Sequence, residues 1–496
     1  MITVSFPLIT PVRAYPLSCT VVAHSAGRPV GASDADDERS GVRRTSVGAA
    51  MAVAVAVAAV AAPAATSVAR AAQPEPVQLV AINDFHGHIA LTAGAESRLT
   101  VGPVADGKWG TDKNGNSDDQ VVRVGGAMNV ASTVHRLQSA FHEQAGGSAP
   151  SFFVSAGDIV GASPPVSGDY KDEPSVEAAN AMGLDVSAVG DDEFSRGSQE
   201  LRRISAATDG QATDDVTACQ GVTKGKTGCF GEGRHAFHGA RYPYLVANVI
   251  DKVTRQPILP PYQIFYTPTG VRIALIGAVT QNLPALVPAK GIADVTVIDE
   301  ADAINRWVPE IRSKGVEAIG VLIHEGAQRK GPQALDPNGC EGVVGPITRI
   351  NDRVDPAVDF LVSGYTHQPY ICELPVPGSQ PRLVTNAGAY GRMVTDIRLT
   401  LDPASGDVDR RATYSAKNVA VTRTAPDARV QAIVDYWTAG PGNQPAAPSE
   451  PLRGSTSTAS VERQQGGLIG AVVLILAFAL PLGVWLFVRR RSTRPG

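Results

Sequence analysis

Short apolar runs rich in β-branched residues recur along the middle of the chain, and each is followed closely by an acidic or imidazole side chain. The runs lie at Val77–Ile82, Ser151–Ser155, Val186–Val189, Ala318–Ile323 and Val358–Val362. Continuous apolar runs of this length predict strands that are buried on both faces of a sheet. Helical candidates lie between them, at Gly126–Ala140, Ser175–Ala181 and Glu300–Ser313. Strands that alternate with helices predict an α/β fold in which helices cover the sheets.

The first part of the chain has the pattern of an export signal. Arg43 and Arg44 precede an apolar run from Ala49 to Ala65, and a small-x-small site, Ala69-Arg70-Ala71, follows it. Positive charge, apolar run and small-residue site in this order are typical of a secretory signal peptide. A membrane helix is the alternative, but this run is short for one. We therefore expect residues 1–71 to be a leader with a signal peptide.

The last part of the chain has the pattern of a membrane anchor. Gly467–Val488 contains no charged residue, and an arginine cluster begins directly after it. A run of this length can span a bilayer, and a basic cluster is expected to stay in the cytoplasm. We therefore predict a single transmembrane helix at 467–488 and a basic cytoplasmic tail at 489–496. Before them, residues 426–466 predict a linker helix and a flexible stalk, because the second part of this segment is rich in Gly, Pro, Ser and Thr.

The net charge and the cysteine content give two further expectations for the remaining domain, residues 72–425, one on its partners and one on its disulfides. The net charge of −4 argues against binding of nucleic-acid polymers, which requires a basic face. Four cysteines remain after the leader, and an even number outside the cell predicts two disulfides. We favour Cys219–Cys229 and Cys340–Cys372, since the first two cysteines share one loop, although the sequence leaves the pairing open. A zinc site of four thiolates is the alternative, but the chain has no CxxC pair.

The polar residues that follow the strands are candidate metal ligands. They are Asp84, His86, Asp158, Asp191, His324 and His367. Ligands of α/β proteins gather at the carboxyl ends of strands, so these distant side chains can converge on one site. Aspartate and histidine without sulfur suit hard and borderline divalent cations, and a carboxylate such as Asp158 can bridge two of them. Two ions about 3.5–4 Å apart activate a water and clamp the oxygens of phosphoryl transfer. Four other histidines match no motif and are expected at the surface: His135, His142, His235 and His238.

The ordered set resembles that of a known enzyme family. Asp84-x-His86, Gly157-Asp158, Gly190-Asp191-Asp192-Glu193, His324 and Gly364-x-x-His367 resemble the motifs of the calcineurin-like metallophosphoesterases, within them the exported 5′-nucleotidase group. Arg123–Gly126, Tyr242–Val249 and Thr385–Arg392 resemble further family segments, so the resemblance extends from about Val77 to Asp402. It implies a four-layer α/β/β/α sandwich that holds two divalent ions (Zn, Mn or Mg) and hydrolyses phosphate esters, often nucleotides.

The resemblance also assigns roles to the candidate ligands. Asp84, His86, Asp158 and His367 would hold the first metal ion, and Asp158, Asp191 and His324 would hold the second. Asp191 stands where the family has an asparagine, and it can still bind a cation. Tyr365 stands where the family has one more histidine ligand. A neutral phenol is a poor substitute, so the second site is expected to be weaker.

A further departure concerns proton transfer. Asp192 stands where the family has a histidine that stabilises the phosphoryl group and acts as an acid, and Ser195 replaces the acidic partner of that histidine. Asp192 could donate a proton only if its pKa were raised. The base-recognition domain of the family is not expected after residue 425, and the substrate-binding residues are unknown.

Two hypotheses follow from these departures. The first is a phosphoesterase that is anchored in the cell membrane by one helix, with an extracellular catalytic domain that uses a metal-activated water. The second is a catalytically degenerate relative that acts as a surface binding protein.

Overall fold

The computed structural model describes residues 73–102, 109, 119–147, 149–205, 218–268, 270–330, 335–411 and 415–443. These residues belong to one unit, Arg70–Gly496. The predicted leader, the stalk after residue 443, the transmembrane helix and the cytoplasmic tail lie outside the described residues. Among the residues that are described, no helix combines the length and the apolar character that crossing a membrane requires.

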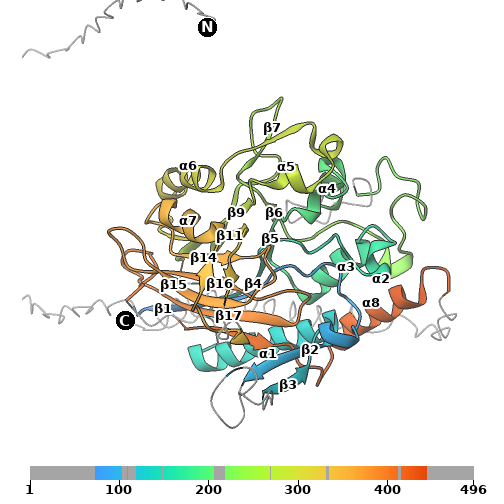
Figure 1. Ribbon diagram of the computed structural model, residues 1–496, viewed down its shortest axis with the longest axis horizontal. Coiled ribbons are helices and arrows are strands. Elements are labelled where there is room, and N and C mark those ends of the chain that lie inside the picture. Colours follow the sequence, from blue (N-terminus) through green and yellow to red (C-terminus); the bar gives the residue numbers. More distant parts are fainter. Residues whose placement is uncertain are drawn as a thin grey trace, which may run out of the picture. The chain divides into compact units, whose positions relative to one another are not determined.

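The first of two six-stranded sheets has the strand order β18-β17-β1-β4-β5-β6 (Figure 1). Its strands are β1 (Glu75–Ile82), β4 (Ser151–Ser155), β5 (Val186–Ala188), β6 (Tyr244–Leu245), β17 (Met393–Leu401) and β18 (Ser415–Ala420). The neighbours from β1 to β6 pair in parallel, whereas β17 and β18 pair antiparallel at one edge. The strands predicted near residues 77, 151 and 186 are therefore confirmed, and they lie side by side.

The second six-stranded sheet has the order β15-β16-β14-β11-β9-β8. Its strands are β8 (Tyr262–Tyr266), β9 (Arg272–Val279), β11 (Ala318–His324), β14 (Phe360–Ser363), β15 (Tyr370–Leu374) and β16 (Arg382–Asn386). The four central strands are parallel, and an antiparallel strand closes each edge. Both strands predicted for this region, near residues 318 and 358, lie in its centre.

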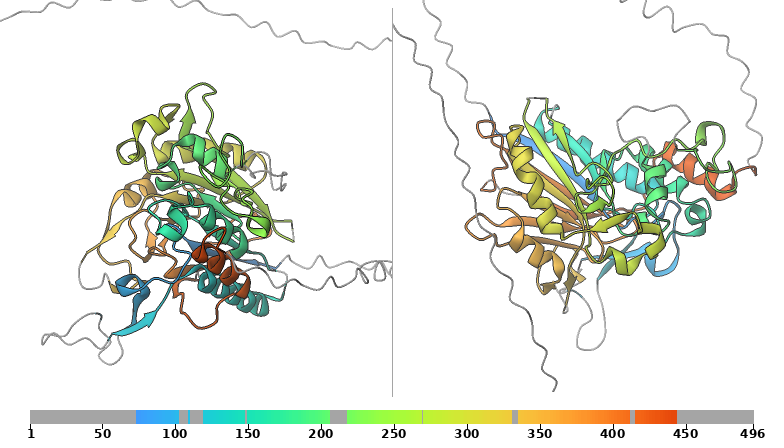
Figure 2. Two further views of the ribbon diagram at one scale, coloured as in Figure 1. Left: turned by 90° about the vertical axis from the view of Figure 1, so that its right-hand side faces the viewer. Right: turned by 90° about the horizontal axis from the view of Figure 1, so that it is seen from above.

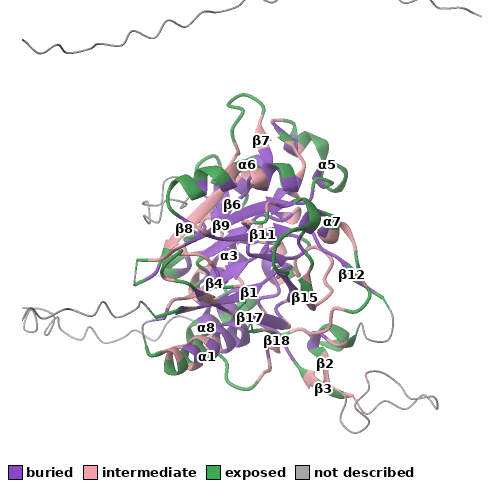
Figure 3. Cartoon of the chain, turned by 90° about the vertical axis from the view of Figure 1, so that its left-hand side faces the viewer, coloured by how far each residue is buried: buried purple, intermediate pink, exposed green. Residues whose placement is uncertain are grey.

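Apolar side chains of both sheets form a shared core, so the sheets pack face to face. Leu79 of β1, Leu275 of β9 and Leu322 of β11 are all fully buried in it. Gly277 permits this close approach, because a Cβ atom there would lie 2.3 Å from the carbonyl oxygen of Leu245 in the other sheet. The central strands of both sheets are buried (Figure 3).

Helices cover the outer face of each sheet. α1 (Ala127–Ala145) and α3 (Glu173–Met182) belong to the core of the first sheet, and α6 (Glu300–Ser313) and α7 (Pro346–Arg353) belong to the core of the second. The two pairs of helices lie on opposite sides of the paired sheets (Figures 1 and 2). The layers therefore run α/β/β/α, and the mixed α/β fold class is confirmed.

The helix expected to begin the linker, α8 (Ala428–Ala439), packs in this domain. It lies against α1 and α3, and Trp437 is almost completely buried in their common core. The indole N–H of Trp437 donates to the carboxylate of Glu177 on α3 at 2.7 Å. Asp427 caps the helix by accepting the backbone N–H groups of Arg429 and Val430. The folded part of the chain thus extends beyond residue 425.

Smaller elements occupy the connections. The strands are β2 (Arg98–Gly102), β3 (Gln120–Arg123), β7 (Val249–Asp251), β10 (Val295–Val297), β12 (Gln328–Arg329) and β13 (Val343–Val344). The short helices are α2 (Pro165–Gly168), α4 (Ser198–Ile204), α5 (Leu283–Leu286), η1 (Gly94–Ser97), η2 (Asp192–Phe194), η3 (Gly233–His235) and η4 (Ala289–Ile292).

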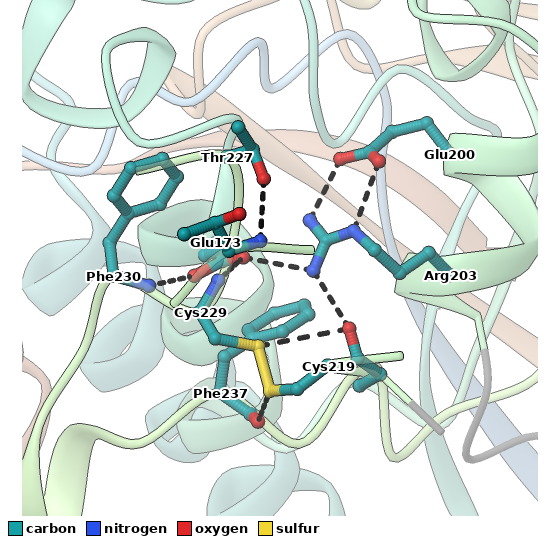
Figure 4. The surroundings of a disulfide bond; sticks show 10 residues. Glu173, Glu200, Arg203, Cys219, Thr227, Cys229, Phe230 and Phe237 are labelled. Carbon is teal, nitrogen blue, oxygen red and sulfur yellow. Dashed lines mark hydrogen bonds and ion pairs between the residues drawn. A yellow bond between two sulfur atoms is a disulfide. The ribbon is translucent and has the colours of Figure 1, made fainter. Parts of the chain in front are cut away.

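Both favoured disulfides are present, Cys219–Cys229 and Cys340–Cys372. Figure 4 shows how the first is tied to the domain. The fully buried carboxylate of Glu173 on α3 accepts the backbone N–H groups of Cys229 and Phe230 and pairs with Arg203 at 2.9 Å. The disulfide loop is therefore fixed to the first helix layer by a buried, hydrogen-bonded ion pair.

Candidate metal centre

The predicted ligands lie in turns directly after the central strands or at a strand's last residue. His324 is the last residue of β11, and the other ligands follow β1, β4, β5 and β14. Asp84, His86, Asp158 and His367 all adopt left-handed backbone conformations, with φ between 48° and 57°. Such conformations are uncommon for residues with a side chain, and they concentrate at functional sites. The backbone is thus strained at four of the six predicted ligands.

Four of these side chains form a first cluster. Nε2 of His86 lies 3.1 Å from Nε2 of His367 and 3.6 Å from Oδ2 of Asp158. Nε2 of His367 lies 3.2 Å from Oδ1 of Asp84. Asp84, His86 and Asp158 are buried, whereas the His367 side chain is 37% exposed. Three of the four side chains in the cluster are therefore buried, and His367 is the one that solvent reaches.

A second cluster shares Asp158 with the first. Nε2 of His324 lies 3.0 Å from Oδ2 of Asp158 and 3.2 Å from Oδ1 of Asp191. Asp158 is therefore placed between the two clusters, where a bridging carboxylate would lie. The structure brings together all six residues predicted as ligands, and it also places Asp192 beside His86.

The hydrogen bonds of the imidazole rings indicate which ring nitrogen of each histidine can bind a cation. Nδ1 of His324 faces the carbonyl oxygen of Ala156 at 2.8 Å, and Nδ1 of His86 faces that of Gly161 at 3.0 Å. Since carbonyl oxygens only accept, both Nδ1 atoms carry a proton, and in the neutral ring Nε2 presents a lone pair. Nε2 of His324 and Oδ1 of Asp191 are buried and have no hydrogen-bond partner among the described residues.

Lone pairs that face one another at about 3 Å repel unless a cation lies between them, so this donor set fits divalent metal ions. The protein alone responds by holding protons instead. Burial opposes the charge of His86, but the hydrogen bond to Asp192 and the charges of Asp158 and Asp84 raise its pKa to about 9. These acidic and imidazole side chains are therefore stabilised by positive charge, supplied either by metal ions or by protons.

Asp192 does not have the environment that an acid requires. Its Oδ2 lies 3.2 Å from Nδ1 of His86, and its Oδ1 accepts the hydroxyl of Ser195. Burial opposes ionisation, but the hydrogen bonds from His86 and Ser195 lower the pKa of Asp192 below its ordinary value. The raised pKa that proton donation by Asp192 would need is thus absent.

Tyr365 does not act as the missing imidazole. Its backbone N–H donates to both carboxylate oxygens of Asp84 at 3.0 Å, and its ring meets that of His324 edge-on at 5.7 Å. Burial, together with the charges of Asp191 and Glu325, raises the pKa of the Tyr365 phenol. The neutral phenol is a poor ligand, although the backbone of Tyr365 orients Asp84.

Other residues that hold the ligands were not recognised from the sequence. Glu193 accepts the backbone N–H groups of Asp158, Ile159 and Gly190. The Asn83 amide donates to Oδ2 of Asp84 at 2.5 Å and to the carbonyl oxygen of Gly388 at 2.6 Å. Glu193 could have been recognised from its position in the Gly-Asp-Asp-Glu segment. The contact of Asn83 with the residues after β16 could not, because those residues are distant in sequence.

One of the histidines assigned to the surface is buried. Nδ1 of His235 lies 2.7 Å from the Glu177 carboxylate, and its ring stacks on Tyr436 at 3.9 Å. The surface assignment of His235 is therefore wrong, because α8 covers it. A second buried ring, His88, stacks on Tyr390 beside the first cluster at 4.1 Å.

Comparison with known proteins agrees with this geometry. No protein-family model matches the chain. The chain is 29% identical to the endonuclease YhcR of Bacillus subtilis over 73% of its own length, and 29% identical to the cell wall protein Lmo0130 of Listeria monocytogenes over 75%. It is 30% identical to the 2′,3′-cyclic-nucleotide 2′-phosphodiesterase/3′-nucleotidase of Salmonella typhimurium over 27% of its length, which is 20% of that enzyme. The chain spans only 25% of YhcR and 42% of Lmo0130.

Solved structures show the same fold. The sulfate thiohydrolase SoxB of Thermus thermophilus superposes with a TM-score of 0.50 at 16% identity, over 73% of this chain and 60% of that one. The homologues and the solved structures indicate a calcineurin-like phosphoesterase of the 5′-nucleotidase group. Its relatives in that group are phosphoesterase and nucleotidase hydrolases.

Proposed function

We propose that this protein is a metal-dependent phosphoesterase of the 5′-nucleotidase type, which hydrolyses phosphate esters, nucleotides among them. The observation that carries the proposal is the set of buried imidazole and carboxylate lone pairs that face one another around Asp158. Divalent ions held there would supply hydroxide at neutral pH and would neutralise charge on the phosphoryl oxygens.

The side chains divide this work between them. Asp84, His86, His367 and Asp158 would hold the first ion, and Asp158, Asp191 and His324 would hold the second. The His86 and His324 rings are fixed by N–H donation to backbone carbonyl groups. The fixed rings keep both Nε2 atoms aimed at the centre, which would reduce the reorganisation that ion binding requires.

The names of the relatives support the substrate class and the location. They include an endonuclease, a cyclic-nucleotide phosphodiesterase and a 5′-nucleotidase, which act on phosphate esters of nucleotides. One relative is a cell wall protein. We propose that the catalytic domain is exported by the leader and held at the cell surface by the helix predicted at 467–488.

The test is phosphate-ester hydrolysis by the purified full chain with Mn²⁺, Zn²⁺ or Mg²⁺. Suitable substrates are p-nitrophenyl phosphate, bis(p-nitrophenyl) phosphate and a panel of nucleotides. The Asp158→Asn variant is the matched control, because it keeps the shape of the bridging residue and removes its charge. Hydrolysis that requires metal and is lost in the variant supports the proposal. Equal rates for both proteins, with every metal, would overturn it.

A second function, a surface binding protein without catalysis, is favoured by the engagement of Asp192 with His86 and by the neutral phenol at Tyr365. Under it the native chain binds one metal ion at most and releases no phosphate. Changing residues 191, 192, 195 and 365 together to Asn, His, Asp and His should then create hydrolysis. Two bound ions and normal turnover in the native chain would exclude this function.

A further inference from the structure

The contacts of Asp192 indicate a role other than the proton donation that its position in the motif suggests. Oδ2 of Asp192 lies 3.2 Å from Nδ1 of His86, and its backbone N–H donates to Oδ1 of Asp158 at 2.9 Å. The hydroxyl of Ser195 donates to the other carboxylate oxygen, Oδ1. The side chain is only 21% exposed. Asp192 therefore contacts two predicted metal ligands, and its own oxygens are both engaged.

The backbone opposite Asp192 is shaped to admit it. Gly161 has φ = +82°, and a Cβ atom at this position would lie 2.6 Å from Cβ of Asp192. A side chain at 161 would thus push Asp192 away from the ring of His86. The carbonyl oxygen of Gly161 also faces Nδ1 of His86, at 3.0 Å. The lack of a side chain at Gly161 therefore allows the Asp192 carboxylate to approach His86.

We infer that Asp192 is a positioning residue that holds His86 in its Nδ1–H tautomer, with Nε2 directed at the first metal ion. This inference rests on the proposed metal centre. A carboxylate behind a metal-ligating imidazole fixes the tautomer and the ring orientation, and it increases the basicity of the ligand nitrogen. Ser195 fixes the carboxylate in turn. The replacement of the family histidine and of its acidic partner has then produced a new support for a metal ligand.

The same contacts argue against a direct catalytic use of Asp192. A group that transfers a proton to a leaving oxygen needs a free donor within hydrogen-bond distance of it. Oδ1 of Asp192 accepts the hydroxyl of Ser195, and Oδ2 lies 3.2 Å from Nδ1 of His86. The carboxylate faces the far side of the His86 ring, away from Nε2, and so it acts on the centre through His86.

The test measures metal affinity rather than turnover. Mn²⁺ binding to the full chain is followed by isothermal titration calorimetry for the wild type, Asp192→Ala, Ser195→Ala and Asp158→Asn. We expect Asp192→Ala to weaken Mn²⁺ binding by roughly 10- to 100-fold, the usual effect of removing such a partner. We expect Ser195→Ala to weaken it less, because the carboxylate remains.

The chain contains a matched control for this experiment. Glu177 also pairs with the Nδ1 atom of a buried histidine, His235, at 2.7 Å, but that ring stacks on Tyr436 and is not a predicted ligand. Glu177→Gln should lower the melting temperature and leave Mn²⁺ affinity unchanged. With Co²⁺ in the site, the visible absorption spectrum should change in Asp192→Ala and stay the same in Glu177→Gln, since only the first variant alters a ligand ring.

The possible outcomes separate this inference from the proposed function. If Asp192→Ala binds Mn²⁺ within about twofold of the wild type while Asp158→Asn does not bind, the inference is wrong and the metal centre stands. If Glu177→Gln weakens binding as much as Asp192→Ala does, the effect is a general loss of stability and the inference is also wrong. If the wild type binds no Mn²⁺, Zn²⁺ or Co²⁺, both the inference and the proposed function fail.

Discussion

Replacing Glu193 with alanine is expected to loosen the two turns that carry Asp158 and Asp191. The Glu193 side chain is almost completely buried. Its carboxylate accepts the backbone N–H groups of Asp158 at 2.9 Å, Ile159 at 2.8 Å and Gly190 at 2.5 Å. One side chain therefore joins the turn after β4 to the turn after β5, and alanine would leave three buried donors without this acceptor.

The magnitude follows from those three donors. Each buried N–H that loses its partner costs about 1–3 kcal/mol, so the simple sum is about 3–9 kcal/mol. Local relaxation and entry of water reduce such sums, and single substitutions seldom exceed about 4–5 kcal/mol. We therefore expect Glu193→Ala to lower the free energy of unfolding by about 3–4 kcal/mol. Because both turns supply predicted ligands, Mn²⁺ affinity should fall as well.

Denaturant unfolding and Mn²⁺ calorimetry together provide the assay, and Glu173→Ala is the matched comparison. Glu173 is fully buried and accepts the N–H groups of Cys229 and Phe230, so its loss also leaves buried donors unpaired. Both variants should be destabilised, but only Glu193→Ala should bind Mn²⁺ more weakly under conditions where both are folded. The reasoning is refuted if Glu193→Ala keeps the wild-type affinity, or if Glu173→Ala loses as much.

Three further changes probe other parts of the structure. The double change of Cys340 and Cys372 to serine removes a bridge across 32 residues and should lower the free energy of unfolding by about 3–4 kcal/mol, measured with guanidinium; no change would mean that the bridge adds no stability. Gly190→Ala should abolish Mn²⁺ binding, because the new Cβ would lie 2.0 Å from Oδ1 of Asp158; calorimetry with wild-type affinity would show that the turn can adapt. Tyr365→His should increase the number of Mn²⁺ ions bound at a fixed concentration, measured by elemental analysis after dialysis; an unchanged number would mean that the second ion does not use this position.

The central strands could be predicted from the sequence because burial on both faces leaves a continuous apolar run. All five predicted strands are present, and the helix predicted at Glu300–Ser313 has these bounds in the structure. Two of the edge strands, β8 and β18, were not predicted. β8 and β18 are mostly half-buried or exposed, so they carry no such run, and their pairing is decided by the neighbouring strand.

The candidate ligands could be predicted for a related reason, since each follows or ends a predicted strand. Their supports could not, because the supporting contacts join residues that are far apart in sequence. Asn83 meets Gly388 across 305 positions, and no local pattern marks that pair. α8 was assigned to a linker because it lies beside a predicted stalk, whereas its place is decided by burial of Trp437 against α1 and α3.

Two departures from the family motifs add negative charge, and a third, Ser195 in place of an acidic residue, removes one. Where the resemblance implies a neutral asparagine and a neutral histidine, this chain has Asp191 beside His324 and Asp192 beside His86. Both carboxylates are partly exposed, with 17% of the Asp191 side chain and 21% of the Asp192 side chain accessible to solvent. Tyr365 adds no compensating charge. The centre is therefore more negative than the family motif implies, whatever divalent ions it holds.

A more negative centre should discriminate between classes of phosphate ester. Two unit charges about 4 Å apart interact by about 4 kcal/mol near a protein surface, and a monoester dianion carries one more charge than a diester monoanion. We therefore expect the ratio of kcat/KM for bis(p-nitrophenyl) phosphate to that for p-nitrophenyl phosphate to exceed one. Asp191→Asn should shift this ratio towards the monoester, because it removes one charge and keeps the shape of the side chain. A ratio that does not change in Asp191→Asn would show that charge at this position does not select the substrate, and that the choice between esters depends on the shape of the site instead.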